Sequence, residues 1–374
     1  MPFAFSKEEC EFRRFAREVT EREVVPCIES SRLVGHPPRE LWKRMGEAGF
    51  LGVRYPEEVG GSAGSLTLAC LALEELSRVA PGIASGSEVH MSLGTRPLQT
   101  AGTAEQIERW LEPALRGDAI CAFALTEPGA GSDVNGIRTT ARPERGGWVL
   151  DGSKTFITNG GIADFVVVVA RSEHGLSILV VERGDAGFSA GPPFQKMGGS
   201  GFIASPLYFD SCFLPNDRLI GAEGQGLDLV FECLDDSRLL VAAESLGIGK
   251  SAFELALEHA GTREQFGRPI GKFQAVRFRL ADMAVTLEAS EHLIYAAARR
   301  CDLGERCSKE ASMAKLFASE GATRIAHDAL LTLGGTGYMQ GSGVEQAYRD
   351  AVLNEIVEGT SDIQRVVIAR ELGL

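Results

Sequence analysis

Apolar residues in the first third of the chain recur at helical spacing. Between Glu9 and Glu23 charged residues occupy the other faces, and the apolar positions are Phe12, Phe15, Ala16 and Val19. This i, i+3, i+4, i+7 spacing is typical of an amphipathic helix. The same pattern predicts further helices over Leu41–Gly49, Leu66–Val79 and Glu105–Leu115. We therefore expect a helical layer over residues 1–117.

The pattern changes at Ala119 to short β-prone segments separated by turn-forming residues. These segments are Ile120–Thr126, Gly147–Asp151, Lys154–Thr158, Phe165–Arg171, Leu176–Glu182 and Leu207–Phe213. Six short strands without helices between them predict an antiparallel barrel or sandwich, not a doubly wound sheet. We place this central β domain at residues 118–226.

Beyond Gly226 the chain returns to long amphipathic helical segments. They cover Leu227–Ala260, Gln274–Arg300, Cys307–Leu331 and Val344–Val357. Four such segments predict a four-helix bundle over residues 227–374. The expected fold class is α+β: an N-terminal α-helical domain, a central antiparallel β-barrel or sandwich domain, and a C-terminal helical bundle.

The overall charge of −13 over 374 residues argues against a nucleic-acid surface and gives no long-range attraction to a polyanionic ligand. A nucleic-acid surface needs a basic stripe, so no nucleic-acid partner is expected. A polyanionic ligand such as a CoA nucleotide would have to be met by a local cluster of Arg and Lys. The longest apolar run, Ala119–Leu125, is too short to cross a membrane.

The cysteines and histidines give no sign of a metal site. The eight cysteines are scattered without a C-x-x-C pair, and the six histidines are isolated. Reduced thiols in a cytoplasmic protein are the simplest interpretation. The N-terminus also lacks a basic segment followed by an apolar one, so no secretory signal is expected.

Glu358, within the stretch Asn354–Arg365, is the strongest candidate for chemistry. Gly359 permits a sharp backbone break after it, and Thr360 or Ser361 is a candidate N-cap for the next helix. Ser361 and Gln364 also have the spacing of a capping box. A carboxylate at a packed helix–helix corner can be desolvated, which raises its pKa and suits a general base. The alternative is a solvated glutamate at a turn.

Three other segments are rich in glycine or arginine. Ala124–Gly136 offers backbone N–H and hydroxyl groups to a phosphate or a polar ring, and Arg263–Gln274 offers two arginines suited to pyrophosphate. Gly334–Gly343 partly matches a dinucleotide loop. Each segment taken alone is equally compatible with an ordinary connection. A complete G-x-G-x-x-G occurs nowhere in the chain, which argues against a standard Rossmann site.

Taken together, these motifs resemble those of the acyl-CoA dehydrogenase family. The sequence carries ALTEPGAGSD, KTFITNG, REQFG, LGGTGY and EGTSDIQR in the family's order and spacing. The resemblance runs from about Lys7 to Arg370. It implies FAD as cofactor, an acyl thioester as substrate, a homodimer or homotetramer, and an external electron acceptor such as an electron-transfer flavoprotein.

The resemblance also implies roles for individual residues. Those expected to contact the flavin or the thioester are Leu125, Thr126, Gly131 and Ser132. Those expected against the isoalloxazine ring are Phe156 and Thr158. The pyrophosphate and adenosine would be held by Arg263, Gln265, Phe266 and Gln274. The dinucleotide would be approached by Gly334, Gly335 and Gly337, and the site would be closed by Thr360 and Asp362. Substrate-binding candidates are Ser132, Asp235, Arg238 and Gly359.

Glu358 would then remove the α-proton of the thioester while the flavin accepts hydride from the β-carbon. By the same resemblance, the thioester oxygen would be stabilised by the Glu358 N–H and a flavin ribityl hydroxyl. Some family members carry the base immediately before the arginine at position 238. This chain has Ser237 there, which cannot serve as a base and strengthens the assignment to Glu358.

Two questions stay open at this stage. Glu244 stands where the family prefers a small residue, so it is expected either to bind a polar or cationic acyl group or to form a salt bridge across the bundle. The alternatives to a dehydrogenase are a flavin oxidase or monooxygenase of the same fold, and a catalytically idle FAD-binding module. The sequence does not distinguish a CoA thioester from one on a carrier protein.

Overall fold

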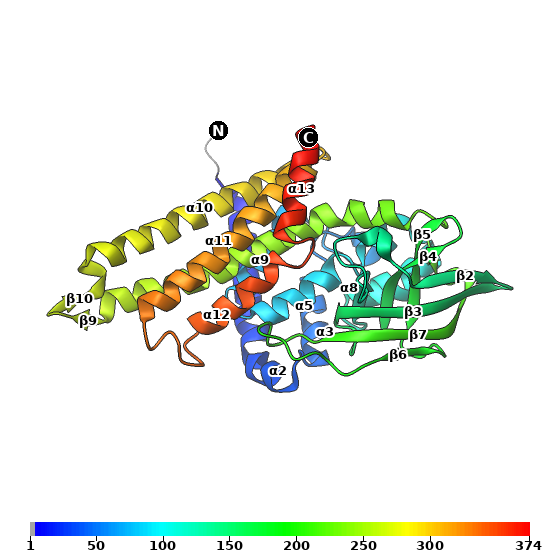
Figure 1. The fold of residues 1–374 in the computed structure, drawn as a ribbon, viewed down its shortest axis with the longest axis horizontal. Helices are drawn as coiled ribbons and strands as arrows, with labels where there is room; N and C mark the ends of the chain where they lie inside the picture. Colours follow the sequence, from blue (N-terminus) through cyan, green and yellow to red (C-terminus); the bar gives the residue numbers. More distant parts are fainter. Residues whose placement is uncertain (1–3) are drawn as a thin grey trace.

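The computed structural model describes residues 4–374 and shows two helical regions packed together, with a sheet at one end of the molecule (Figure 1). The first helical region contains α1 (Lys7–Val19), α2 (Ile28–Val34), α3 (Arg39–Glu47), α4 (Leu66–Ser77), α5 (Pro81–Met91), α6 (Arg96–Ala101), α7 (Ala104–Gln106) and α8 (Glu112–Leu115). The expected amphipathic helices correspond to α1, α3, α4 and α7–α8. The sequence pattern missed α2, α5 and α6.

The sheet is built mainly from antiparallel neighbours. Its strands are β1 (Cys121–Ala124), β2 (Thr140–Glu144), β3 (Gly147–Thr158), β4 (Phe165–Ser172), β5 (Gly175–Glu182), β6 (Phe188–Ala190), β7 (Ala204–Pro215) and β8 (Leu219–Ile220). They lie in the order β6-β7-β3-β2-β4-β5-β8, and β1 pairs in parallel with β4. The sheet does not close into a barrel, so the sandwich alternative holds.

The C-terminal region is a bundle of long helices. Its elements are α9 (Gly226–Thr262), the hairpin strands β9 (Glu264–Gln265) and β10 (Arg268–Pro269), α10 (Gln274–Asp302), α11 (Ser308–Leu333), α12 (Val344–Ala351) and α13 (Ser361–Glu371). The predicted segment Val344–Val357 is helical only to Ala351 and then continues as a 3₁₀ turn, Val352–Glu355. None of the helices within residues 4–374 is long and apolar enough to span a membrane.

Helix α4 joins the two helical regions into one core. Apart from Leu68, all its residues are buried, and it packs with α9, α10 and α11 in one apolar cluster. The Asp302 carboxylate at the end of α10 accepts hydrogen bonds from the backbone N–H groups of Leu66 at 2.7 Å and Thr67 at 3.1 Å. This contact satisfies N–H groups that a helix N-terminus leaves without intrahelical partners. It fixes the start of α4 against the end of α10.

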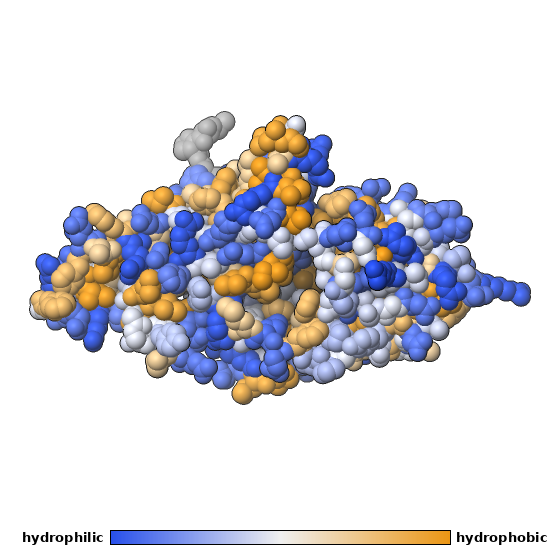
Figure 2. All heavy atoms as spheres, viewed as in Figure 1, coloured by the Kyte–Doolittle hydropathy of each residue, from blue (hydrophilic) through white to orange (hydrophobic). Residues whose placement is uncertain are grey.

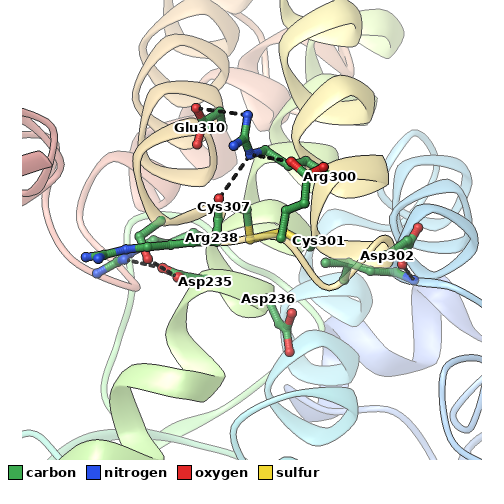
Figure 3. Close-up of a disulfide and its surroundings, with 12 residues drawn as sticks. Asp235, Asp236, Arg238, Arg300, Cys301, Asp302, Cys307 and Glu310 are labelled. Atoms are coloured by element: carbon green, nitrogen blue, oxygen red, sulfur yellow. Dashed lines mark hydrogen bonds and ion pairs between the residues drawn. A yellow bond between two sulfur atoms is a disulfide. The ribbon is translucent and has the colours of Figure 1, made fainter.

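The expectation that all cysteines are reduced is wrong. Cys301 and Cys307 form a disulfide between the end of α10 and the start of α11, while the other six cysteines are free (Figure 3). The sequence search for C-x-x-C pairs missed it because the two residues are six positions apart and face each other only across the α10–α11 turn. The inference of a cytoplasmic location from reduced thiols therefore loses its basis.

Candidate active site

Glu358 lies in a strained turn between the 3₁₀ segment that follows α12 and the start of α13. Its φ is +54° and that of Gly359 is +90°, so both residues are in the left-handed region. A non-glycine residue rarely adopts this conformation unless its surroundings hold it there, and such residues cluster at functional sites. The conformation re-aims the Glu358 side chain relative to the helices on either side.

Side chains from two helices hold this turn. The Gln364 side-chain amide donates to the carbonyl oxygens of Glu358 at 3.0 Å and Gly359 at 2.8 Å, and Lys315 Nζ donates to Gly359 O at 2.9 Å. Thr360 is the N-cap of α13, since its hydroxyl accepts from the Ile363 N–H. The capping box expected from Ser361 and Gln364 is wrong, because Gln364 bonds to the turn carbonyls instead.

The surroundings of Glu358 act on its pKa in opposite directions. Burial raises its pKa, whereas the hydroxyl of Ser237 and the charges of Lys315 and Arg238 oppose the rise. The direction agrees with the expectation from the sequence. Burial also lowers the pKa of Lys315 to about 8. Among residues 4–374 no acceptor is recorded for the Glu358 N–H, which leaves this group able to donate to a ligand.

Of the predicted substrate-binding residues on α9, Arg238 faces this carboxylate, and Asp235 is connected to it through Arg238. Arg238 donates to Asp235 Oδ1 at 2.8 Å, and Ser308 at the start of α11 also donates to Asp235. Figure 3 shows both α9 residues near the disulfide that joins α10 to α11. Burial lowers the pKa of Arg238, while the charges of Asp235 and Glu358 oppose this effect. The structure thus brings Asp235, Arg238, Glu358 and Gly359 together.

Sequence reasoning missed a second carboxyl group at this site, Glu88 on α5. Its Oε1 accepts hydrogen bonds from the hydroxyls of Ser92 at 2.7 Å and Ser237 at 2.8 Å. Burial, followed by the charge of Glu358, raises the pKa of Glu88 well above its usual range. Helix α5 has buried residues around its circumference, so it lacks the polar stripe by which a helix is detected in a sequence.

Glu244 is buried on α9 without a cation. Its Oε1 accepts from the Ser85 hydroxyl at 2.6 Å, and the nearby Asn354 amide, which donates to Ser245 at 3.0 Å, lowers its pKa. Within residues 4–374 it forms no ion pair, so the predicted salt bridge across the bundle is wrong. Burial raises its pKa to about 8. The polar-substrate alternative for Glu244 stays a prediction.

A buried ion pair connects the two motifs expected at the flavin. Lys154 Nζ lies 2.8 Å from Glu127 Oε1 and donates to Leu125 O at 2.9 Å. The Thr155 N–H donates to Thr126 O at 2.9 Å. The loop after β1, which carries Leu125 and Thr126, is therefore fixed to β3. Neither partner of the ion pair was singled out from the sequence, since their contact depends on the fold.

The loop after β1 and the adjoining strand β3 together form a surface that we call the platform. Its exposed residues suit a flat ring and a polar tail. A β-bulge in β3 between Lys154 and Ile157 places Phe156 at φ +58° with 65% of its surface exposed, and Thr158 follows two residues later. A side chain at Gly131 would meet no neighbouring atom, and Ser132 beside it is exposed. Open backbone next to an exposed aromatic ring fits a flavin nucleotide.

The residues expected at the adenosine lie at the other end of the molecule. Arg263, Gln265 and Phe266 surround the β9–β10 hairpin, and Gln274 begins α10. The hairpin and the sheet occupy opposite ends (Figure 1). One chain therefore does not bring these residues to the Leu125 loop.

Glycines after α11 differ in what they permit. At Gly334 and Gly335 a side chain would meet open space, which fits close approach by a ligand. At Gly337 a Cβ would lie 2.6 Å from the Leu330 carbonyl oxygen, so glycine is required there by packing alone.

Thr360 caps α13, and the Asp362 side chain is exposed and 3.4 Å from Arg365.

Family models cover almost the whole chain. The N-terminal, middle and C-terminal domains of acyl-CoA dehydrogenase match residues 6–118, 122–212 and 224–373. The chain belongs to the acyl-CoA dehydrogenase family. An acyl-CoA dehydrogenase of Bacillus subtilis (strain 168) is 40% identical over 372 residues, which is 98% of each chain.

Solved structures agree with this membership. The butyryl-CoA dehydrogenase of Megasphaera elsdenii superposes with a TM-score of 0.96 at 34% identity, covering 100% of both chains. The FAD complex of PigA has a TM-score of 0.97 at 31% identity, again over 100% of both chains. The protein is an FAD-dependent dehydrogenase that converts an acyl-CoA to the enoyl-CoA. The helix–sheet–helix fold and the cofactor expected from the sequence are confirmed.

Proposed function

We propose that Glu358 is the base that removes the α-proton of the acyl thioester. The observation that carries this proposal is its backbone geometry: a half-buried carboxyl group in a left-handed turn, held by Gln364 and Lys315. Burial raises its pKa toward the range useful for a base at neutral pH. The nearby cations Lys315 and Arg238 keep its ionised form accessible.

The thioester would lie between this carboxylate and the platform of β1 and β3. The free N–H of Glu358 supports a role as donor to the thioester oxygen, where negative charge develops. Asp235, Arg238, Ser132 and Gly359 would contact the substrate along its thioester and pantetheine portion. FAD, when bound, supplies the acceptor for the hydride of the β-carbon. The ring would be held by Leu125, Thr126, Gly131, Ser132, Phe156 and Thr158, with Thr360 and Asp362 closing the site.

The adenosine half of the cofactor would be completed by a second copy of the chain. Arg263, Gln265, Phe266, Gln274, Gly334, Gly335 and Gly337 lie too far from the platform to serve the same cofactor within one chain (Figure 1). Large apolar side chains are exposed on helices and loops of this region, as expected for an interface, among them Phe266, Phe278, Tyr338 and Met339. Figure 2 shows apolar surface toward that end. We propose a homodimer or homotetramer that passes electrons to an electron-transfer flavoprotein.

The test is Glu358→Gln, which keeps the shape of the side chain and removes its basic oxygen. Under anaerobic conditions, acyl-CoA should still bind and perturb the flavin spectrum. The rate of flavin reduction should fall by about 10²–10⁴-fold, the usual contribution of a general base. The wild type should also exchange the α-hydrogen of a bound, non-oxidisable thioester with deuterated solvent, and the variant should not.

Glu355→Gln is a matched control, because Glu355 lies in the 3₁₀ turn just before the base. It should reduce flavin at the wild-type rate. Reduction at the wild-type rate in Glu358→Gln would show that the base is another residue. Rapid reoxidation of the substrate-reduced flavin by oxygen would instead favour an oxidase.

A further inference from the structure

Glu88 is a buried acid that the proposed reaction does not use. Its surface is 2% exposed, and within residues 4–374 it forms no ion pair. Its hydrogen-bond donors are two neutral hydroxyls, Ser92 just after α5 and Ser237 on α9. An ionised carboxylate this deep in a protein ordinarily requires a cation or several charge-stabilising donors. Glu88 has only the two hydroxyls.

Ser237 lies between Glu88 and the base. Its hydroxyl donates to Glu88 at 2.8 Å, and the same hydroxyl neighbours the Glu358 carboxyl group, whose pKa it lowers. A serine hydroxyl carries one hydrogen, so it donates to one of the two carboxyl groups at a time. Two ionised carboxylates around a single shared hydroxyl repel each other, and the pair therefore retains one proton.

The surrounding charges decide which carboxyl group holds that proton. Glu358 is faced by the cations Lys315 from α11 and Arg238 from α9. Glu88 is faced by the hydroxyls of Ser92 and Ser237 and by two acids, Glu358 and Glu244. The negative charge is thus favoured on Glu358 and the proton on Glu88.

We propose that Glu88 is a positioning residue for the base: its neutral carboxyl group, linked to Glu358 through the Ser237 hydroxyl, keeps Glu358 ionised and oriented before substrate arrives. The Glu88 O–H donates to Ser237 Oγ, and the Ser237 O–H donates to the Glu358 carboxylate. Once Glu358 has taken the α-proton, it no longer needs this donor, and the hydroxyl turns to Glu88. No proton leaves Glu88 during the step. The inference rests on Glu358 being the base.

Two consequences separate this role from simple packing. Loss of the Glu88 proton at high pH would put a second negative charge beside the site where charge develops on the thioester, so activity should fall there. Loss of the hydrogen-bonded link should make Glu358 harder to ionise. Glu88 therefore sets an alkaline limit of activity and shifts the acid limit.

The experiment compares the pH dependence of anaerobic flavin reduction by a straight-chain acyl-CoA in FAD-loaded variants. Glu88→Gln stays neutral at all pH values and should abolish the alkaline limb while leaving the acid limb in place. Glu88→Leu removes the link and should move the acid limb upward by about one pH unit. Ser237→Ala should give the same upward movement although Glu88 itself is not substituted.

Glu244→Gln is the matched control, since Glu244 is an equally buried carboxyl group on α9 without a cation. It should keep both limbs. An alkaline limb that persists in Glu88→Gln, or that disappears in Glu244→Gln instead, would overturn the proposal.

Infrared difference spectroscopy supplies a measurement that needs no turnover. At neutral pH, Glu88→Gln should lose one carboxylic-acid C=O band relative to the wild type, because the Glu88 proton is absent. An unchanged band would show that Glu88 is ionised and would refute the inference. If the band is lost but Glu358→Gln still reduces flavin at the wild-type rate, the assignment of the base fails while the location of the proton stands.

Discussion

Replacing Glu244 by Gln should stabilise the protein at alkaline pH and change little at acidic pH. Glu244 is 2% exposed, and its carboxyl group is bound by the Ser85 hydroxyl at 2.6 Å. Burial raises its pKa from the ordinary 4.5 to about 8. Gln has nearly the same shape, and its carbonyl oxygen can still accept from Ser85.

The size of the effect follows from the two pKa values. The folded carboxyl group keeps its proton up to about pH 8, whereas in the unfolded chain it ionises above about pH 4.5. In this window the unfolded state binds fewer protons, so stability is fully present below the window and is lost as the pH rises. At 1.36 kcal/mol per pKa unit, the loss reaches up to about 5 kcal/mol by pH 9. Gln does not titrate, so the variant should not lose stability in this way as the pH rises.

The assay is urea unfolding of the FAD-loaded wild type and Glu244→Gln at pH 5 and pH 8.5. The variant should gain stability relative to the wild type mainly at the higher pH. Glu232→Gln provides a control on an exposed glutamate of the same helix, and it should show no pH-dependent difference. If Glu244→Gln were less stable than the wild type at pH 8.5, Glu244 would have to be ionised and stabilised in the folded protein.

Further predictions concern the cofactor, the assembly and the disulfide. Acid precipitation of the purified yellow protein should release one FAD per chain, and a colourless protein that FAD cannot reconstitute would contradict this. Light scattering should show a dimer or tetramer, and Arg263→Ala should lower the FAD content; an FAD-saturated monomer would refute the shared site. The double variant Cys301→Ser/Cys307→Ser should lose about 2 kcal/mol of stability for so short a loop, and the wild type in reducing buffer should lose the same amount.

Helix α10 could be predicted from the sequence because it presents a polar face to solvent. Predicted Gln274–Arg300 and observed α10 (Gln274–Asp302) differ by two residues. Helix α5 could not be predicted in this way. Its sequence, PGIASGSEVHM, is rich in glycine and serine and is buried on nearly all sides, so no amphipathic period marks it. Because α5 was not predicted, its residues Ser85 and Glu88 were not recognised as candidates either.

Strand prediction failed where local residues suggest a break that the sheet overrides. Gly147–Asp151 and Lys154–Thr158 were expected as separate strands, but they form the single strand β3, with register shifts against β7. Gly152 at φ +144° accommodates the irregularity. Strand β2 was missed because TARPE contains Pro143 and two charged residues, yet it pairs with both β3 and β4. The domain boundaries at residues 117 and 226 stay a prediction.

Motif spacing named a candidate base and candidate flavin loops, but it could not show which distant side chains support them. The Glu127–Lys154 ion pair, the Lys315 contact to the turn and the Glu88–Ser237 hydrogen bond join residues 27 to 149 positions apart. Such pairings arise from packing, and no local pattern encodes them. The residue type alone allowed a conclusion only at position 237, where serine was excluded as the base.

The structure gives that exclusion a further physical meaning. The residue at position 237 donates a hydrogen bond to Glu88 and neighbours Glu358, whose pKa it lowers. A carboxylate there would join two acids already within electrostatic range of each other, and three such groups in a buried site would have to bind extra protons or separate. A hydroxyl has no charge and can donate to either neighbour. Serine at 237 is thus compatible with a base at 358 and an acid at 88, whereas a base at 237 would require at least one of these two carboxyl groups to be replaced.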